Sequence, residues 1–141
     1  MTYTVVAHVK RKVGTTPSEF RTHYDTVHVP LLKSLVGATF PLTHTRNYVT
    51  RNPTASSESS GSGQEAETEF LPVMYKGDAA GVEHDSMTVM VWEDKAAFDR
   101  FKDLFYTPEV FERISEDEKS FLDLSFRRLY ALEQPITTKR D

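Results

Sequence analysis

The chain has 141 residues, a formal net charge of −4 and no cysteine. Its 38% hydrophobic and 11% aromatic content is enough for the core of one domain, and its acidic balance argues against nucleic-acid binding. Without cysteine there are no disulfides and no thiolate chemistry, and the opening stretch fits neither a signal peptide nor a spanning helix. We therefore expect a single soluble, cytoplasmic domain over residues 1–141, with no membrane contact.

The first predicted elements are a strand and a helix. Residues 3–9 are β-rich and alternate in polarity, which predicts a strand. Thr16, Pro17 and Glu19 then form the pattern of a helix start, with an N-cap, a proline in the first turn and a capping box. The buried stripe expected from helical spacing is Phe20, Tyr24, Val27, Leu31 and Leu35.

A proline interrupts this helix. Pro30 has no amide hydrogen and its ring collides with the carbonyl four residues earlier, so we expect the helix to break near His28, with Val29 outside helical geometry. A histidine at a helix C-terminus meets the negative end of the helix dipole, which favours the imidazolium form. His28 is thus predicted to titrate near neutrality, with Tyr24 one turn earlier on the same face.

A second strand is predicted over residues 42–50, where His44, Arg46 and Tyr48 share one face. The following residues 51–69 are rich in Ser, Gly and Glu and almost free of apolar side chains. Such a composition cannot offset the entropy of ordering, so we expect a flexible surface excursion there. It would be either a lid or a tolerated insertion.

The second half of the chain repeats the pattern. A third strand is expected over residues 85–92, apolar on both sides, and a helix capped by Asp94 follows it. Thr107, Pro108 and Glu109 indicate a second short helix, and the last strand is expected over 124–133. The side chains expected to be buried by the two helices are Ala97, Phe98, Phe101, Leu104, Phe105, Val110, Phe111 and Ile114.

The order βαββαβ is that of the ferredoxin-like α+β fold, in which two helices cover one face of a four-stranded sheet. The other face is expected to be largely apolar, and an exposed apolar face needs a cover. The simplest cover is the same face of a second copy, which predicts a homodimer with a cavity between sheets and helices. The residues assigned to this open face are Val6, Met90, Trp92, Phe126 and Tyr130, mixed with His8, His44, Thr88 and Arg128.

The stretch KRKVGTTPSEFRTHYDTVHVPLL resembles the opening of EthD-type domains, which belong to the dimeric α+β-barrel superfamily. The residues that carry the resemblance are Lys10, Arg11, Gly14, Thr16, Pro17, Glu19, Phe20, Tyr24, His28 and Pro30. The resemblance continues through residues 75–101 and 117–130 and implies a homodimeric domain without a cofactor. Fungal relatives act beside aromatic polyketide synthases, for example as decarboxylases of anthrone carboxylates, and other superfamily members are cyclases, dehydratases, isomerases or monooxygenases.

Acid and base chemistry on such a substrate needs groups that move a proton and donors that hold an enolate oxygen. The catalytic candidates are His28, Tyr24, His8 and Asp85. The candidates for substrate binding are His44, Arg46, Tyr48, Trp92, Phe126 and Tyr130. Each of these residues also has a purely structural interpretation, as a helix cap, a core side chain or a member of a surface ion pair.

Metal and nucleotide sites are not predicted. There is no HExxH motif, His23 and His28 are five residues apart and should face different sides of a helix, and the six glycines are scattered. We expect a lyase that tailors an aromatic polyketide-type metabolite by decarboxylation, dehydration or cyclisation. The alternatives are a cofactor-independent monooxygenase of phenols or anthrones and a non-catalytic protein that binds a hydrophobic metabolite.

Overall fold

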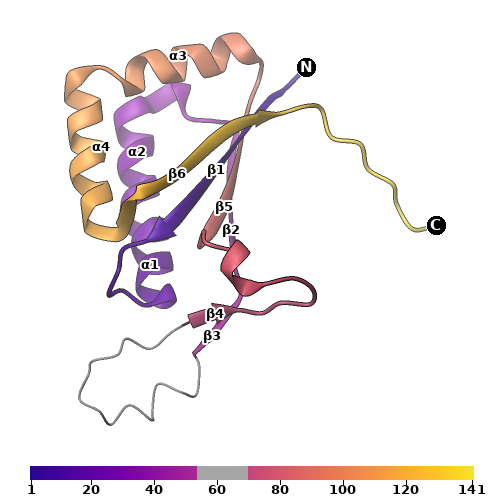
Figure 1. The fold of residues 1–141 in the computed structure, drawn as a ribbon. Helices are drawn as coiled ribbons and strands as arrows, with labels where there is room; N and C mark the ends of the chain where they lie inside the picture. Colours follow the sequence, from indigo (N-terminus) through magenta and orange to yellow (C-terminus); the bar gives the residue numbers. More distant parts are fainter. Residues whose placement is uncertain (54–69) are drawn as a thin grey trace.

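The computed structural model describes residues 1–53 and 70–141 and has the expected α+β architecture. Four antiparallel strands form a sheet in the order β2-β5-β1-β6, which is the ferredoxin-like order. Their bounds are Tyr3–Arg11 for β1, Thr43–Tyr48 for β2, Ser86–Trp92 for β5 and Leu122–Leu132 for β6. All four α-helices lie on one side of this sheet, and the C-terminal residues run away from it (Figure 1).

The strand register decides which side chains face the helices. Val5 of β1 pairs with Met90 of β5, and His44 of β2 pairs with the same Met90, so all three point to the same side. This side is the helix side, because Val5 and Met90 belong to the main buried cluster. The open face carries Val6, His8, Arg128 and Tyr130, as predicted. The placement of His44, Thr88, Met90 and Trp92 on the open face was wrong, because a slip of one residue in reading a strand exchanges its faces.

The helix after β1 does not break at Pro30. Helix α1, Pro17–His23, continues through a π-helical turn, Tyr24–His28, directly into α2, Val29–Val36. Val29 is helical, with φ −65° and ψ −44°, and its amide donates to the carbonyl of Tyr24, five residues back. A π turn takes up one extra residue, so the chain passes Pro30 in the first turn of α2, where a missing amide hydrogen is tolerated.

The extra residue also changes which side chains of this helix are buried. Phe20 and Tyr24 are buried as predicted, but Val27 is 43% exposed and its place is taken by His28. Farther along, Leu32 and Val36 are the buried residues of α2, and Leu31 and Leu35 are only partly buried. The predicted start of α1 is confirmed, since Thr16 accepts from the Glu19 amide and Glu19 accepts from the Thr16 amide.

The second half of the chain supplies the other two helices. Helix α3, Lys95–Phe105, is capped by Asp94 as predicted, and α4 runs over Pro108–Phe121, longer than the short helix expected. Of the expected contacts of α4, Val110 and Ile114 are buried and Phe111 is 43% exposed. Phe121 instead joins Phe20 and Tyr24 in a second buried cluster below α4.

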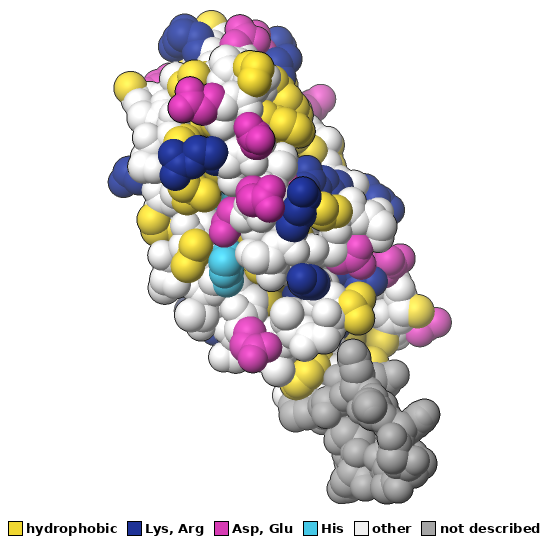
Figure 2. Space-filling view, turned by 90° about the vertical axis from the view of Figure 1, so that its left-hand side faces the viewer, with side chains coloured by type: hydrophobic (Ala, Val, Ile, Leu, Met, Phe, Trp, Pro, Cys, Tyr) yellow, Lys and Arg dark blue, Asp and Glu magenta, His cyan; other side chains and the backbone are white. Residues whose placement is uncertain are grey.

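The excursion predicted over residues 51–69 begins and ends in a small hairpin. Strand β3, Arg51–Pro53, pairs with β4, Phe70–Pro72, and residues 54–69 between them lie outside the described part of the chain. Within the described ranges, no helix is both long and apolar enough to cross a membrane. On the helix-covered side, basic and acidic side chains are interspersed and a histidine reaches the surface among them (Figure 2).

Candidate active site

A cavity of about 200 Å³ lies between the sheet and the helices. Its mouth is at the β6 edge, because Leu129 faces the helix side and is nevertheless 61% exposed. Its apolar walls come from the sheet and from helices α2, α3 and α4. They consist of Ala7, Val9, Leu32, Met90, Phe98, Phe101, Phe105, Phe121, Leu122 and Leu129. The polar residues of the lining include Tyr24, His28, His44 and Glu118, with Lys102, Arg127, Arg128 and His8 also among the lining residues.

His28 lines the cavity and is buried. Its Nδ1 lies 2.9 Å from Oδ2 of Asp117 on α4, and because a carboxylate can only accept, Nδ1 carries the hydrogen. Neutral His28 therefore presents an unprotonated Nε2. Burial lowers the pKa of His28 below 6.5, although the hydrogen bond to Asp117 acts in the opposite direction. The prediction of an imidazolium favoured by a helix C-terminus was wrong, because the helix continues past this residue.

His23 reaches the same carboxylate. Its Nε2 lies 2.9 Å from Oδ1 of Asp117, and its ring stacks on Phe121 with centroids 4.5 Å apart. The expectation that His23 and His28 face different sides was based on the period of an α-helix. A π turn between them brings residues five apart to the same side, so both imidazoles meet Asp117.

Tyr24 connects the two cavity histidines. Its ring centroid is 5.7 Å from that of His28 and 6.1 Å from that of His44. Its hydroxyl is 2.8 Å from Oγ1 of Thr88, which is 3.1 Å from Oγ of Ser86. Burial raises the pKa of Tyr24 to about 12, so the phenol stays protonated and is a hydrogen-bond donor throughout the physiological range.

The partner of His44 is a hydrogen-bond donor, whereas the partner of His28 is an acceptor. Nη1 of Arg46 donates to Nδ1 of His44 over 2.8 Å, and because a guanidinium can only donate, Nδ1 must be the unprotonated nitrogen. The hydrogen of neutral His44 is therefore on Nε2. Burial, followed by the charge of Arg46, lowers the pKa of His44 to about 4, so the ring is neutral at pH 7.

Asp25 fixes this arrangement from the helix side. Its Oδ1 accepts from Nε of Arg46 over 2.7 Å and from the hydroxyl of Tyr48 over 2.5 Å. Burial and the bond to Asp25 raise the pKa of Tyr48. His44, Arg46 and Tyr48 thus share a face as predicted, but Arg46 and Tyr48 are engaged with Asp25 and hold His44 in place.

The structure separates the remaining predicted aromatic residues from this cluster. Trp92 is 1% exposed in the helix-side core, where its Nε1 donates to the carbonyl of Thr39 over 2.9 Å, so it is a core residue. His8 and Tyr130 lie on the open face, where the hydroxyl of Tyr130 is 3.0 Å from Nε2 of His8. Phe126 is covered by the guanidinium of Arg128 at 4.6 Å. These three residues belong to the other side of the sheet from His28.

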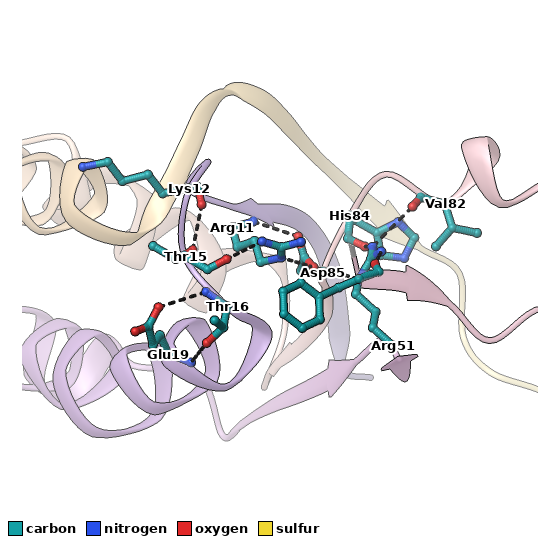
Figure 3. A network of polar contacts seen from close by, with 10 residues as sticks. Arg11, Lys12, Thr15, Thr16, Glu19, Arg51, Val82, His84 and Asp85 are labelled. Atoms are coloured by element: carbon teal, nitrogen blue, oxygen red, sulfur yellow. Dashed lines mark hydrogen bonds and ion pairs between the residues drawn. The ribbon is translucent and has the colours of Figure 1, made fainter. Parts of the chain in front are cut away.

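Asp85 lies in a buried ion-pair network at the start of β5 (Figure 3). Its carboxylate is 2.8 Å from Nε of Arg51 and 3.3 Å from Nε of Arg11, and it accepts from the Arg11 amide over 2.9 Å. Arg51 also donates to the carbonyls of Phe70 and His84 over 2.8 Å each. Asp85 therefore joins the β3–β4 hairpin to the sheet. A second hollow of about 280 Å³ lies beside it, and its lining includes Asp85, Arg51, which is paired with Asp85, and Tyr48, which is bonded to Asp25.

The predictions from sequence missed Asp117 and Glu118, the acids that α4 brings to the cavity. The available signal was an acid within an apolar stripe, since Asp117 lies between the buried Ile114 and Phe121 at helical spacing. The expected short helix stopped before this position. Glu118 is paired with Arg127 of β6 at the cavity edge.

Comparisons with known proteins agree with the fold. The EthD domain family matches residues 12–125. An EthD (ethyl tert-butyl ether D) family protein from Bacillus halodurans superposes with a TM-score of 0.55 at 14% identity, over 96% of this chain and 100% of that one. Two structures of SnoaB, a cofactor-independent oxygenase from Streptomyces nogalater, give a TM-score of 0.49 at 11% and 12% identity, over 99% of this chain and 98% of theirs. No curated protein matches the chain.

Proposed function

Because the chain belongs to the EthD domain family, with 12–125 matched, we propose that it is a cofactor-free lyase that acts by acid/base chemistry on a small aromatic ketone of polyketide type. The observation that carries this proposal is the pair of opposite histidine tautomers. Asp117 occupies Nδ1 of His28, so Nε2 of His28 is free to accept a hydrogen bond in the cavity. Arg46 occupies Nδ1 of His44, so Nε2 of His44 is free to donate one there. A neutral base and a neutral donor beside each other are the groups that enolisation of a ketone requires.

Dehydration of a β-hydroxy ketone uses this pair without any further reagent. Nε2 of His28 takes the proton from the carbon next to the ketone, and the electron pair moves to the ketone oxygen, which accepts a hydrogen bond from Nε2 of His44. The enolate then re-forms the carbonyl and expels the β-hydroxyl, which takes the proton from His28 and leaves as water. His28 returns to its starting tautomer, so atoms and protons balance over one turnover.

Cyclisation by an aldol step and decarboxylation of a β-keto acid pass through the same enolate. Cyclisation also begins with proton removal by His28. Decarboxylation generates the enolate by loss of carbon dioxide, so it uses the donors His44 and Tyr24 but not the base. Since His28 is neutral near pH 7, the geometry favours dehydration or cyclisation over decarboxylation.

The cavity limits the size of the substrate. An apolar cavity of about 150 Å³ in another protein accommodates benzene, so the present 200 Å³ suits one or two aromatic rings. Phe98, Phe101 and Phe105 of α3 form an aromatic wall on one side and Phe121 forms another. A planar substrate would lie between these rings with its ketone toward His44.

The proposal includes a homodimer formed through the open face of the sheet. Several apolar side chains there are exposed in a single chain, with Met87 at 37%, Tyr130 at 45% and Leu132 at 46%. Val89 and Val91 of β5 lie between them on the same face. A second copy that presents the same face would cover this surface.

The test is turnover of one- and two-ring aromatic β-hydroxy ketones and β-keto acids, followed by mass spectrometry. Loss of water or of carbon dioxide identifies the reaction, and His28→Gln is expected to reduce the rate at least about a hundredfold, the usual contribution of a positioned base. His84→Gln, at a position that does not line the cavity, is the matched control and should retain the wild-type rate. A His28→Gln variant as fast as the wild type would contradict the mechanism.

Two other results would replace this proposal. Oxygen consumption with a phenol or anthrone would indicate a cofactor-independent monooxygenase, for which His28 would deprotonate the substrate. Tight binding without turnover of the hydroxy ketones, the keto acids and the phenols or anthrones would indicate a protein that carries a hydrophobic metabolite.

A further inference from the structure

The acid/base site extends beyond the cavity through Asp117. This carboxylate on α4 lies between two imidazoles, with His28 bonded to one oxygen and His23 to the other, each over 2.9 Å. The side chains are 9% exposed for His28, 13% for Asp117 and 26% for His23. The three groups therefore form a line from the cavity to the surface.

We propose that Asp117 and His23 are positioning residues for His28: Asp117 fixes the tautomer that presents Nε2 to the cavity, and protonation of His23 weakens this base. The inference deepens the proposed function, because it concerns how the same site is regulated. The π turn is what makes the arrangement possible, since it places His23 and His28 on the same side of one continuous helix.

The direction of the effect follows from the charges around His28. Asp117 and Glu118 face it from α4, His23 from α1 and His44 from β2, and Arg127 compensates Glu118. The negative charge of Asp117 favours a proton on His28 and a positive charge on His23 opposes it, so the pKa of His28 falls when His23 is charged. Because both imidazoles bond the same carboxylate, a charge on His23 acts directly on His28.

Phe121 holds the two imidazoles in place beside Asp117. Its ring stacks on His23 at 4.5 Å and contacts His28 at 5.0 Å, so both imidazoles are held against one rigid side chain of α4. Ser120 adds only a longer contact of 3.4 Å to Nε2 of His23. The position of His23 is thus set by Asp117 and Phe121. A glutamine at position 23 has a similar size and an amide hydrogen, so it can keep the hydrogen bond to Asp117.

The experiment is an NMR titration of the full chain labelled with ¹⁵N in histidine, which follows the ring nitrogens of His28 from pH 4 to 9. In the wild type, a positive charge on His23 should hold the pKa of His28 down. His23→Gln keeps a donor for Asp117 but carries no charge, so the ring nitrogens of His28 should titrate at higher pH than in the wild type. Asp117→Asn should lower the pKa of His28 by about one unit or more, and Asp117→Glu should restore most of it.

Ser120→Ala is the matched control, because it changes a neighbour of His23 without removing a charge, and its titration should match that of the wild type. A His28 curve that is unchanged in His23→Gln would overturn the role of His23, and a His28 pKa that is not lowered in Asp117→Asn would overturn that of Asp117. If Asp117→Asn does not fold, His23→Gln alone decides. The readout is the imidazole and not turnover, so the result is independent of whether the proposed reaction is correct.

Discussion

At the scale of single residues, the site depends on which nitrogen of each histidine carries the hydrogen. Asp117 is an acceptor and Arg46 is a donor, and this difference gives His28 and His44 opposite tautomers. Both rings are neutral at pH 7 because burial lowers their pKa values. A pair of neutral imidazoles can act as base and donor without an ion in the cavity.

Burying a neutral histidine makes stability depend on pH. The folded pKa of His44 is about 4 and the unfolded value is about 6.5, so the unfolded chain binds a proton that the folded chain does not. The stabilisation is complete above pH 6.5 and is lost as the pH falls toward 4, by up to about 3 kcal/mol for this residue. Urea unfolding of the wild type and His44→Phe at pH 7 and pH 4.5 measures the difference.

His44→Phe keeps the stacking on Phe40, where the two rings are 5.8 Å apart, and removes the titrating group together with the acceptor of Arg46. Contributions from other groups are common to both proteins and cancel. We expect the variant to lose less stability than the wild type on acidification. Equal losses would show that His44 is protonated in the folded protein or not buried.

At the scale of elements, the π turn is the feature on which the site depends. It joins α1 and α2 into one helix and moves His28 into the position of the buried stripe that Val27 would otherwise take. The sequence indicated that Pro30 disturbs the helix, and a break is the common result. Whether a chain breaks or widens at a proline depends on what packs beside it, here the cluster of Phe121 against which Val29 is packed, and local sequence does not contain this information.

Deletion of Thr26 tests this feature, because removing one residue converts the π turn to an α turn. Either Phe20 and Tyr24 or His28 and Leu32 would then rotate out of the core. The loss of two buried side chains should lower the free energy of unfolding by about 3 kcal/mol or more.

Thr26→Ala is the control for the deletion. Thr26 is exposed and its hydroxyl bonds only the carbonyl of Thr22 within the same helix, so the substitution should cost less than about 0.5 kcal/mol. Urea unfolding measures both variants. A deletion variant as stable as Thr26→Ala would mean that the extra residue has no structural role.

At the scale of the whole molecule, strand alternation, helix caps and element order were sufficient to predict the fold. Helix caps and apolar stripes are local, so Thr16 and Asp94 were identified correctly as N-caps. The site was predictable only in part, since His28, Tyr24 and His44 meet in the cavity, His8 lines it although its side chain points to the open face, and Asp85 lies elsewhere. Contacts between distant segments, such as Asp117 with His28, depend on packing that periodicity does not specify.

The proposed homodimer is tested by its mass in solution. The chain has a mass of 16.1 kDa, and sedimentation should give twice this value for the wild type. Met87→Glu places a charge on the open face and should shift the protein toward the monomer. Val27→Glu, at a similarly exposed position on the helix side, should leave the dimer intact, and a wild-type monomer at high concentration would contradict the proposed assembly.

The central claim is that two neutral histidines present opposite nitrogens to one cavity. Long-range ¹H–¹⁵N correlation spectra of the ring nitrogens at pH 7 test it directly and need no substrate. We expect His28 to carry its hydrogen on Nδ1 and His44 to carry it on Nε2. An imidazolium at either position, or the same tautomer at both, would contradict it.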